Sequence, residues 1–497
     1  MSTATDSTTS PPDKNSLTVL RDFSDRLSPI VVKELRQGLR QPSFVILFLF
    51  LQSVLAMAVI TSLFAVSSAS LSERVQTGNV ISGFFFGLFA LSVLIIQPLR
   101  GLNALSSEIK QKTIDLLLLT KLSAWRIVFG KWLCLNTQSA LLLVAILPYL
   151  MMRYFLGGMN ILSELGGILA MFLVSGVFCA AGVGLSAVRS IILRTIFAIL
   201  GVIALITMLQ GSVFLFAFSR GPFISGSVST LMSGSDWTLI ITGSVLLAIY
   251  LTISFLEFGA TRIAPPSENR STRKRLLALI ALFVIPTLFA LPEVDSFYMS
   301  FIAIVIITAL ALADALSENP QHVRPMGENS FWMLRPGWPS GALFGLMLLA
   351  ANIFWLFVLF GLLDSSRGFD SNGQKVVAQL VGTGLLIVSQ PALIIALFRP
   401  YSREPANLYL ASLLGSVALG MVILMINSTM RGSGNLCDMF FPLFPSLGLG
   451  TLEDESFGKA FVMFLTAGIY LASAAILGYN RWKPVVVTKS PVTNPPA

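Results

Sequence analysis

Long apolar runs separated by short polar segments make up most of the chain of 497 residues. A helix needs about 20 predominantly apolar residues to cross the hydrocarbon core of a bilayer. Runs of this kind predict twelve transmembrane helices, which cover approximately residues 43–69, 79–99, 131–155, 164–188, 193–219, 237–258, 276–292, 297–316, 341–363, 376–398, 408–429 and 458–479. The pattern therefore predicts an all-α polytopic membrane protein.

Two of these runs are open to a second interpretation. Residues 276–292 and 297–316 are short and are separated by the sequence PEVDS, so they could instead form a helical hairpin that does not cross fully. Composition agrees with the membrane class, because 55% of the residues are hydrophobic and 11% are charged, against about a quarter charged in soluble domains.

The positions of the basic residues predict the orientation. Lys and Arg accumulate in the cytoplasmic segments of membrane proteins. With the N-terminus inside, most of the 33 Lys and Arg residues are cytoplasmic, and the exceptions are Arg74, Arg153, Arg220, Arg367, Lys375, Arg431 and Lys459. The net charge of +9 is thus explained by topology, without a nucleic-acid partner. We expect a multi-pass protein of the cytoplasmic (inner) membrane, with both termini on the cytoplasmic side.

A short amphipathic segment precedes the first run. Apolar residues recur every four positions at Leu27, Val31, Leu35 and Leu39, and another face carries Lys33, Arg36 and Arg40. Ser28 can cap a helix whose first residue is Pro29. The segment is expected to be a helix over residues 28–41 that lies in the cytoplasmic interface; the alternative is an ordinary basic flank of the first span.

The loop between the second and third spans contains an unusual leucine run. Thr113 and Asp115 suit the first turn of a short helix, Leu116–Leu119 follow, and Ser123 can cap a second helix. A short helix that is apolar on nearly every face must be buried on each side. One side can face the membrane and its own spans, and the other would need a protein partner. The alternative is a loop that merely dips into the interface.

These two segments together resemble the ABC-2 permease family, the membrane subunits of type-2 ABC exporters. The family's elbow helix commonly reads NPILVKELR–LR, and the matching residues here are Pro29, Lys33, Glu34, Leu35, Arg36 and Arg40. Its first cytoplasmic loop commonly reads ERExGTLELLLTxPLSxWEIVLGK, and the matching residues are Glu108, Thr113, Asp115, Leu116, Leu117, Leu118, Leu119, Thr120, Ser123, Trp125, Ile127, Val128, Gly130 and Lys131. The chain departs from the pattern at Ile109, Lys110, Lys112 and Lys121.

The resemblance implies a domain organisation. A six-span core over residues 21–262 would contain the elbow helix at 28–41 and a coupling loop at 100–131. Composition and the apolar runs predict the remaining parts of the chain, which are a disordered tail (1–20), a basic linker (263–275), an additional six-span region (276–480) and a second tail (481–497). The resemblance also implies that the coupling loop docks on a separate ABC ATPase subunit, through Glu108, Thr113, Asp115, Leu116–Leu119, Thr120 and Trp125. A second permease copy or paralogue would be a further partner.

The sequence contains no motif for catalysis, cofactor binding or metal binding. No P-loop of the form GxxxxGK[ST] is present, so ATP would be bound by the partner subunit. The single histidine, His322, has no partner pattern around it, and the three cysteines have no metal spacing. Two other functions remain open: a twelve-span secondary carrier, which would depend on Glu257 or Asp314, and a non-transporting membrane scaffold.

Overall fold

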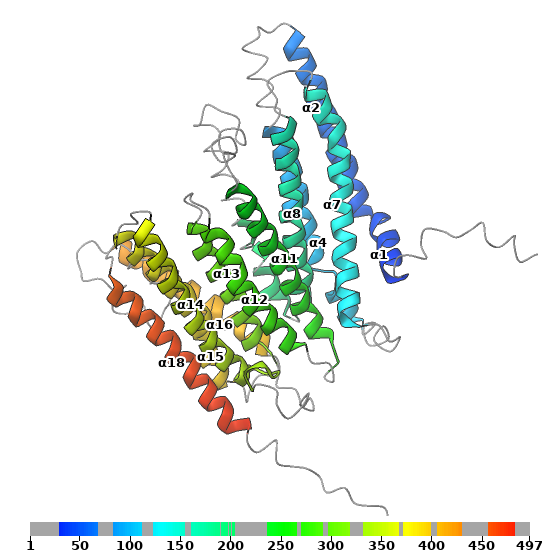
Figure 1. Ribbon diagram of the computed structural model, residues 1–497. Coiled ribbons are helices and arrows are strands. Elements are labelled where there is room, and N and C mark those ends of the chain that lie inside the picture. The colour runs from blue at the N-terminus through cyan, green and yellow to red at the C-terminus, as the bar shows by residue number, and fades with distance from the viewer. Residues whose placement is uncertain are drawn as a thin grey trace, which may run out of the picture.

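The structure, a computed structural model, is helical throughout the residues that it describes (Figure 1). These are residues 29–67, 83–111, 123–154, 161–188, 190–196, 198–199, 201–203, 236–265, 270–291, 297–318, 332–366, 371–398, 405–429 and 456–482. Among them, ten helices are long and apolar enough to cross a membrane. The architecture is that of a polytopic helical membrane protein, as the apolar pattern predicts.

The N-terminal half begins with a short helix and continues as a group of long ones. Its elements are α1 (Pro29–Leu39), α2 (Pro42–Ser67), a helix over residues 83–90 that continues as η2 (Leu91–Ile96) and α4 (Gln97–Gly101), α5 (Ser106–Lys110), α7 (Ala124–Tyr154), α8 (Ile161–Ser186) and α11 (Asp236–Ile263). A shorter apolar helix runs over Ile191–Ile203. The element η2 is π-helical, a form that usually occurs as a local bulge within α-helices.

The C-terminal half lies beside this group in Figure 1 and ends with the red helix α18. Its elements are α12 (Ser271–Ala290), α13 (Phe297–Leu316), the 3₁₀ turn η3 (Trp332–Leu334), α14 (Trp338–Ser366), α15 (Ser371–Phe398), α16 (Pro405–Thr429) and α18 (Phe457–Trp482). The expected spans 193–219 and 276–292 are not among the ten long apolar helices, and residues 204–235 lie outside the described part of the chain.

The ends of most of the long helices meet at one of two ends of the bundle, and α8 and α11 both finish at the same end, where Gly184 meets the Phe255 carbonyl. At that end the Leu105 amide donates to the Ser186 hydroxyl at 3.2 Å, and Gly478 of α18 packs on Pro339. Most basic residues of the described chain lie at this end, which we call the basic end; they include Lys33, Arg100, Lys131, Arg194, Arg262 and Arg275, whereas Arg153, Lys375 and Lys459 belong to the opposite ends of their helices. Helix α1 and the last turn of α18 both lie at this end.

Helix α12 begins earlier than the apolar pattern predicts. It starts at Ser271 instead of residue 276, so Lys274 and Arg275 belong to its first turns and not to the linker. Its length equals that of α13, at 20 residues each. The two helices pair along their whole length, because Lys274 contacts Asp314 at one end and the Ser300 hydroxyl donates to the Pro286 carbonyl at the other. The basic first turns are the reason that α12 is less apolar than its neighbour.

The two halves share a hydrophobic core. Tyr250 of α11 is buried among residues of α12 and α13, including Leu282 and Ile307, and its hydroxyl donates to the Ile307 carbonyl at 3.5 Å. The additional region over residues 276–480 therefore packs directly against the last helix of the N-terminal half.

Small residues let three helices of the N-terminal half approach closely. A Cβ atom added at Gly182 of α8 would lie 2.4 Å from the Pro98 carbonyl oxygen of α4, and one added at Gly184 would lie 2.4 Å from the Phe255 carbonyl oxygen of α11. Backbone contact through small residues is a common way for membrane helices to associate without a hydrophobic driving force. Helices α4, α8 and α11 thus form one tightly packed block at the basic end.

Candidate functional site

Helix α1 forms where the sequence predicts it and lies against α7. It begins at Pro29 and ends at Leu39, with Lys33, Arg36 and Arg40 exposed and Val31 buried. The amphipathic pattern produces this arrangement, because the basic face points away from the bundle. Ser28, the expected capping residue, lies outside the described residues.

The contact between α1 and α7 depends on a glycine. A Cβ atom at Gly38 would lie 2.5 Å from the Cys134 sulfur and 2.6 Å from the Gln138 side-chain nitrogen. The Cys134 thiol donates to the Glu34 backbone carbonyl at 3.2 Å. The absence of a side chain at Gly38 therefore lets α1 approach the face of α7 that carries Lys131, Cys134 and Gln138.

A lysine on the same face of α7 joins three elements. The Lys131 ammonium lies 3.2 Å from a Glu34 carboxylate oxygen of α1 and 2.7 Å from a Glu108 carboxylate oxygen of α5. Its side chain is 8% exposed, while those of Glu34 and Glu108 are 19% and 18% exposed. We call these residues the Lys131 triad. Ion pairs that are largely removed from water are costly to break, because the remaining charge is left without its partner.

An arginine holds the turn between α1 and α2 in a similar way. The Arg100 guanidinium donates to the side-chain carbonyl oxygens of Gln41 (3.0 Å), Gln97 (2.9 Å) and Gln138 (2.6 Å). It also lies over the Phe44 ring, 5.6 Å from the centroid, a distance typical of cation–π contacts. The start of α2 is therefore attached to α4 and α7 next to the Lys131 triad.

A hydrophobic core lies beneath the loop whose ends are α5 and α7. Leu105, Ala124 and Val128 are fully buried there with Val183 of α8 and Ala260 of α11. Both ends of the loop are thus fixed to the block of α4, α8 and α11. The centre of the loop, residues 112–122, lies outside the described residues.

The predicted site residues divide into two groups. Those of the elbow helix (Lys33, Glu34, Leu35, Arg36 and Arg40) and two of the coupling residues, Glu108 and Trp125, lie in described helices, and the structure brings Glu34 and Glu108 together. Trp125 is half-buried and stacks on Phe129, with ring centroids 6.1 Å apart. The remaining coupling residues, Thr113, Asp115, Leu116, Leu117, Leu118, Leu119 and Thr120, lie outside the described residues.

Two residues at the centre of this arrangement are missing from the predicted site. Lys131 enters the sequence pattern only as the last position of the loop motif, and Arg100 only as the first residue of the loop range 100–131. The sequence does contain a signal for Lys131. A charged lysine at the start of a run of about 20 mostly apolar residues costs free energy in a membrane, so it indicates that the lysine has an acidic or polar partner.

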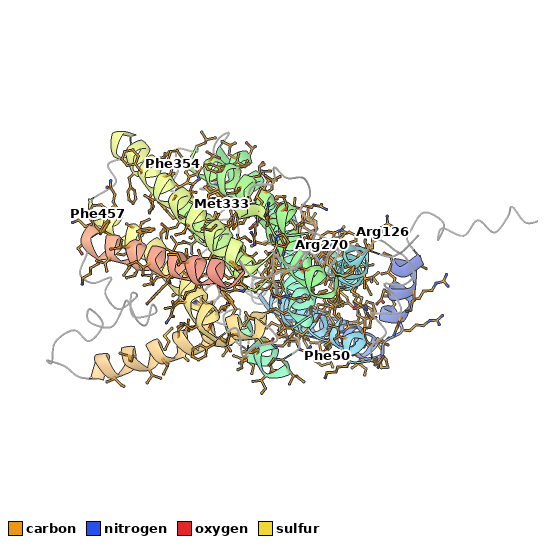
Figure 2. All side chains as sticks on the ribbon, turned by 90° about the horizontal axis from the view of Figure 1, so that it is seen from below. Phe50, Arg126, Arg270, Met333, Phe354 and Phe457 are labelled. Atoms are coloured by element: carbon orange, nitrogen blue, oxygen red, sulfur yellow. The ribbon has the colours of Figure 1, made fainter. Side chains whose placement is uncertain are left out.

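A second group of buried charges joins the start of α12 to the end of α13 at the basic end. Lys274 contacts Asp314 at 2.6 Å and Glu318 at 3.0 Å, and Arg275 contacts Glu318 at 2.9 Å. We call these four residues the Lys274 cluster. Nearby, Arg270 contacts Glu257 of α11 at 3.1 Å, and Figure 2 places Arg270 between the two helix groups when the bundle is seen from below. The two acids that a secondary carrier would use, Glu257 and Asp314, are both ion-paired.

The turn before α14 completes this cluster. The Gly337 amide donates to a Glu318 carboxylate oxygen at 3.3 Å, and its carbonyl accepts from Arg275 at 3.1 Å. Gly337 has a φ of 124°, which side chains of L-residues rarely tolerate. Burial acts to raise the pKa of Glu318, but Lys274 and Arg275 outweigh it and lower that pKa to about 2.

Metal-ligand residues do not gather in groups of three or more His, Cys, Asp or Glu within the described ranges, and His322 falls outside them. The side chains at the basic end bind one another through charge and hydrogen bonds, and so attach α1, α5 and α7 to one another. No protein-family model, no curated protein and no solved structure matches this chain.

Proposed function

We propose that the chain is the membrane-spanning permease subunit of an ATP-driven ABC-2 exporter in a cytoplasmic membrane. In this proposal it couples a separate ATPase subunit to substrate translocation. The observation that carries the proposal is the Lys131 triad, which joins the elbow helix, the start of the coupling loop and the helix that leaves it. A second permease, either another copy or a paralogue, would complete the transporter.

The triad gives a physical route for coupling. A partner that pushes on the loop displaces α5 at one end and α7 at the other. Glu108 and Lys131 lie at these two ends and are bonded to each other, so the ends move together. Glu34 adds α1 to the same unit, and Arg100 adds the start of α2 through Gln41. Movement at the loop would therefore reach the interfacial helix and the first span together.

The source of energy also supports a separate ATPase. The sequence contains no P-loop, and a carrier driven by ions would need an ionisable group that is free to change its charge. Glu257 is paired with Arg270, and Asp314 with Lys274. The pairing gives both acids a structural role at the junction of the two halves, which favours the ATPase-dependent function over the carrier.

Co-purification from native membranes tests the proposal. The tagged chain is expected to retain a P-loop ATPase, identified by mass spectrometry. The double variant Leu117→Asp/Leu118→Asp is expected to lose it, because two charges in the leucine run prevent its burial. Met333→Asp is the control, since Met333 is an exposed apolar side chain at the same end but outside the loop. Equal ATPase retention by the double variant and the control would reject the docking role, and the absence of any ATPase from the wild type would favour the scaffold.

A further inference from the structure

A groove opens at the basic end between residues 99–103 and the helix Ile191–Ile203, outside the Lys131 triad and the Lys274 cluster. Its volume is about 450 Å³. Its lining is mixed in character and includes Leu99, Asn103, Arg194, Thr195, Ile199 and Ile203. A concave site with apolar walls and a few polar groups is the usual form of a small-molecule site.

Arg194 is the charged group of the groove, and its charge is not neutralised within the described chain. The residue is only 5% exposed, and its guanidinium donates one long hydrogen bond, 3.5 Å, to the Ser186 carbonyl. A guanidinium has five N–H donors and no acceptor. A buried cation is costly unless it is paired and hydrogen-bonded, so the groove offers a strong site for an anion.

Polar and apolar residues occupy different depths of the groove. Asn103 and Arg194 lie toward the basic end, where the helices on either side of the groove end and begin. Ile203 lies nine positions further along its helix than Arg194, which corresponds to about 14 Å at 1.5 Å per residue. Ile199 and Ile203 are 54% and 51% exposed, and Leu99 lies on the opposite wall. Ile191 and Leu102 also line the groove near the basic end. The polar and charged lining residues, Asn103, Arg194 and Thr195, are thus confined to that end, and from Ala198 to Ile203 the described lining is apolar.

The π-helical turn η2 supports the deeper wall of the groove. Leu94 and Ile95 of η2 are buried and pack with Val202, another residue of the groove lining. Within membrane bundles and elsewhere, π-helical turns are frequent at functional sites. Here the turn lies directly behind the apolar part of the groove.

We propose that this groove binds one anionic phospholipid, with its phosphate on the Arg194 guanidinium and an acyl chain along Ile199 and Ile203. Asn103 is exposed and supplies a second donor at the headgroup. Inorganic phosphate shares the headgroup chemistry but has no group that uses the apolar walls. The site does not depend on the proposed ATPase partnership. Leu102 and Asn103 fall within the range of the expected coupling loop, but no residue of the groove is among those expected to dock on the ATPase, and none belongs to the elbow helix.

Native mass spectrometry of delipidated protein tests the site. The protein is titrated with phosphatidylglycerol and with diacylglycerol of the same chains, which lacks the phosphate, and inorganic phosphate is added as a competitor. Arg194→Gln is expected to weaken phosphatidylglycerol binding about tenfold, as befits the loss of a charge-assisted pair. Arg126→Gln is the matched control, because Arg126 is an exposed arginine at the same end outside the groove, and it is expected to bind like wild type.

A second variant keeps the test independent of Arg194. Ala198→Phe fills the groove but leaves the charge in place, and it is expected to lose phosphatidylglycerol binding as well. Wild-type binding by both variants would overturn the proposal. Equal binding of diacylglycerol, or displacement of the lipid by an equal concentration of inorganic phosphate, would also overturn it, since either result would mean that the two parts of the groove do not act on one ligand.

Discussion

The Lys131 ammonium lies 2.7 Å from the Glu108 carboxylate, although 23 positions separate the two residues in the sequence. This ion pair closes the base of the loop between α5 and α7. The Glu34 carboxylate of α1 reaches the same ammonium, so one lysine holds helix α1 and both ends of a loop.

Replacement of this lysine is expected to destabilise the protein. Lys131→Gln leaves two carboxylates close together without their cation, and breaking a largely buried pair in this way costs about 1–3 kcal/mol when its partners retain some exposure. Thermal unfolding in detergent, followed by tryptophan fluorescence, measures the loss. Arg126→Gln removes the same charge from an exposed position of α7 and is expected to unfold like wild type.

The triad interpretation also predicts non-additivity. In the Lys131→Gln background, the further change Glu34→Gln is expected to restore part of the lost stability, because it removes one of the two unpaired charges. In the wild-type background the same change is expected to be destabilising. Additive effects of the two substitutions would show that Glu34 and Lys131 do not interact.

Backbone contact between α8 and α11 makes Gly184 intolerant of a side chain. Gly184→Val is expected to prevent normal packing, since even the first carbon of the side chain would overlap the Phe255 carbonyl, and neither backbone can move without displacing its helix. Fluorescence-detected size-exclusion chromatography is expected to show a loss of the monodisperse peak. Gly166→Val on the same helix has open space around it and should keep the peak.

The Lys274 cluster predicts a stability that depends on acid pH. The pKa of Glu318 is about 2 in the folded protein and near 4.5 in the unfolded chain. Because the folded-state value is the lower one, the stabilisation is complete above pH 4.5 and is lost as the pH falls toward 2. The melting temperature should therefore drop between pH 5 and pH 3, and by less in Glu318→Gln, which has no carboxylate at this position. Equal drops in both proteins would rule out Glu318 as a source of the acid sensitivity.

The shared core between the halves predicts that they do not fold separately. A chain ending at residue 265 would expose the face of α11 that carries Tyr250 and would leave Glu257 without Arg270. We expect this fragment to aggregate in detergent. Co-expression of residues 266–497 should rescue it as a stable complex, and a monodisperse N-terminal fragment alone would contradict the prediction.

Patterns of apolar residues predict most of the helices, because membrane spans are defined by length and apolar content alone. The same patterns predict α1, whose basic and apolar positions follow the period of a helix. They do not predict that Lys131 reaches both Glu34 and Glu108, because such contacts depend on how three separate helices cross. The apolar pattern also places the start of α12 too late, at residue 276 instead of Ser271. Lys274 and Arg275 are typical of a basic linker, and only their ion pairs with Asp314 and Glu318 explain why they lie within the helix.

The π-helical turn η2 also sets the rotational phase of everything that follows it. In an α-helix each residue advances by about 100° and 1.5 Å, whereas a π-helical turn absorbs one extra residue. If Leu91–Ile96 were α-helical with no residue deleted, Gln97–Gly101 would therefore be rotated by roughly that angle. Arg100 would then point away from Gln138, and the Pro98 carbonyl would leave Gly182. A single extra residue in this helix thus determines the direction in which the arginine that holds α2 faces.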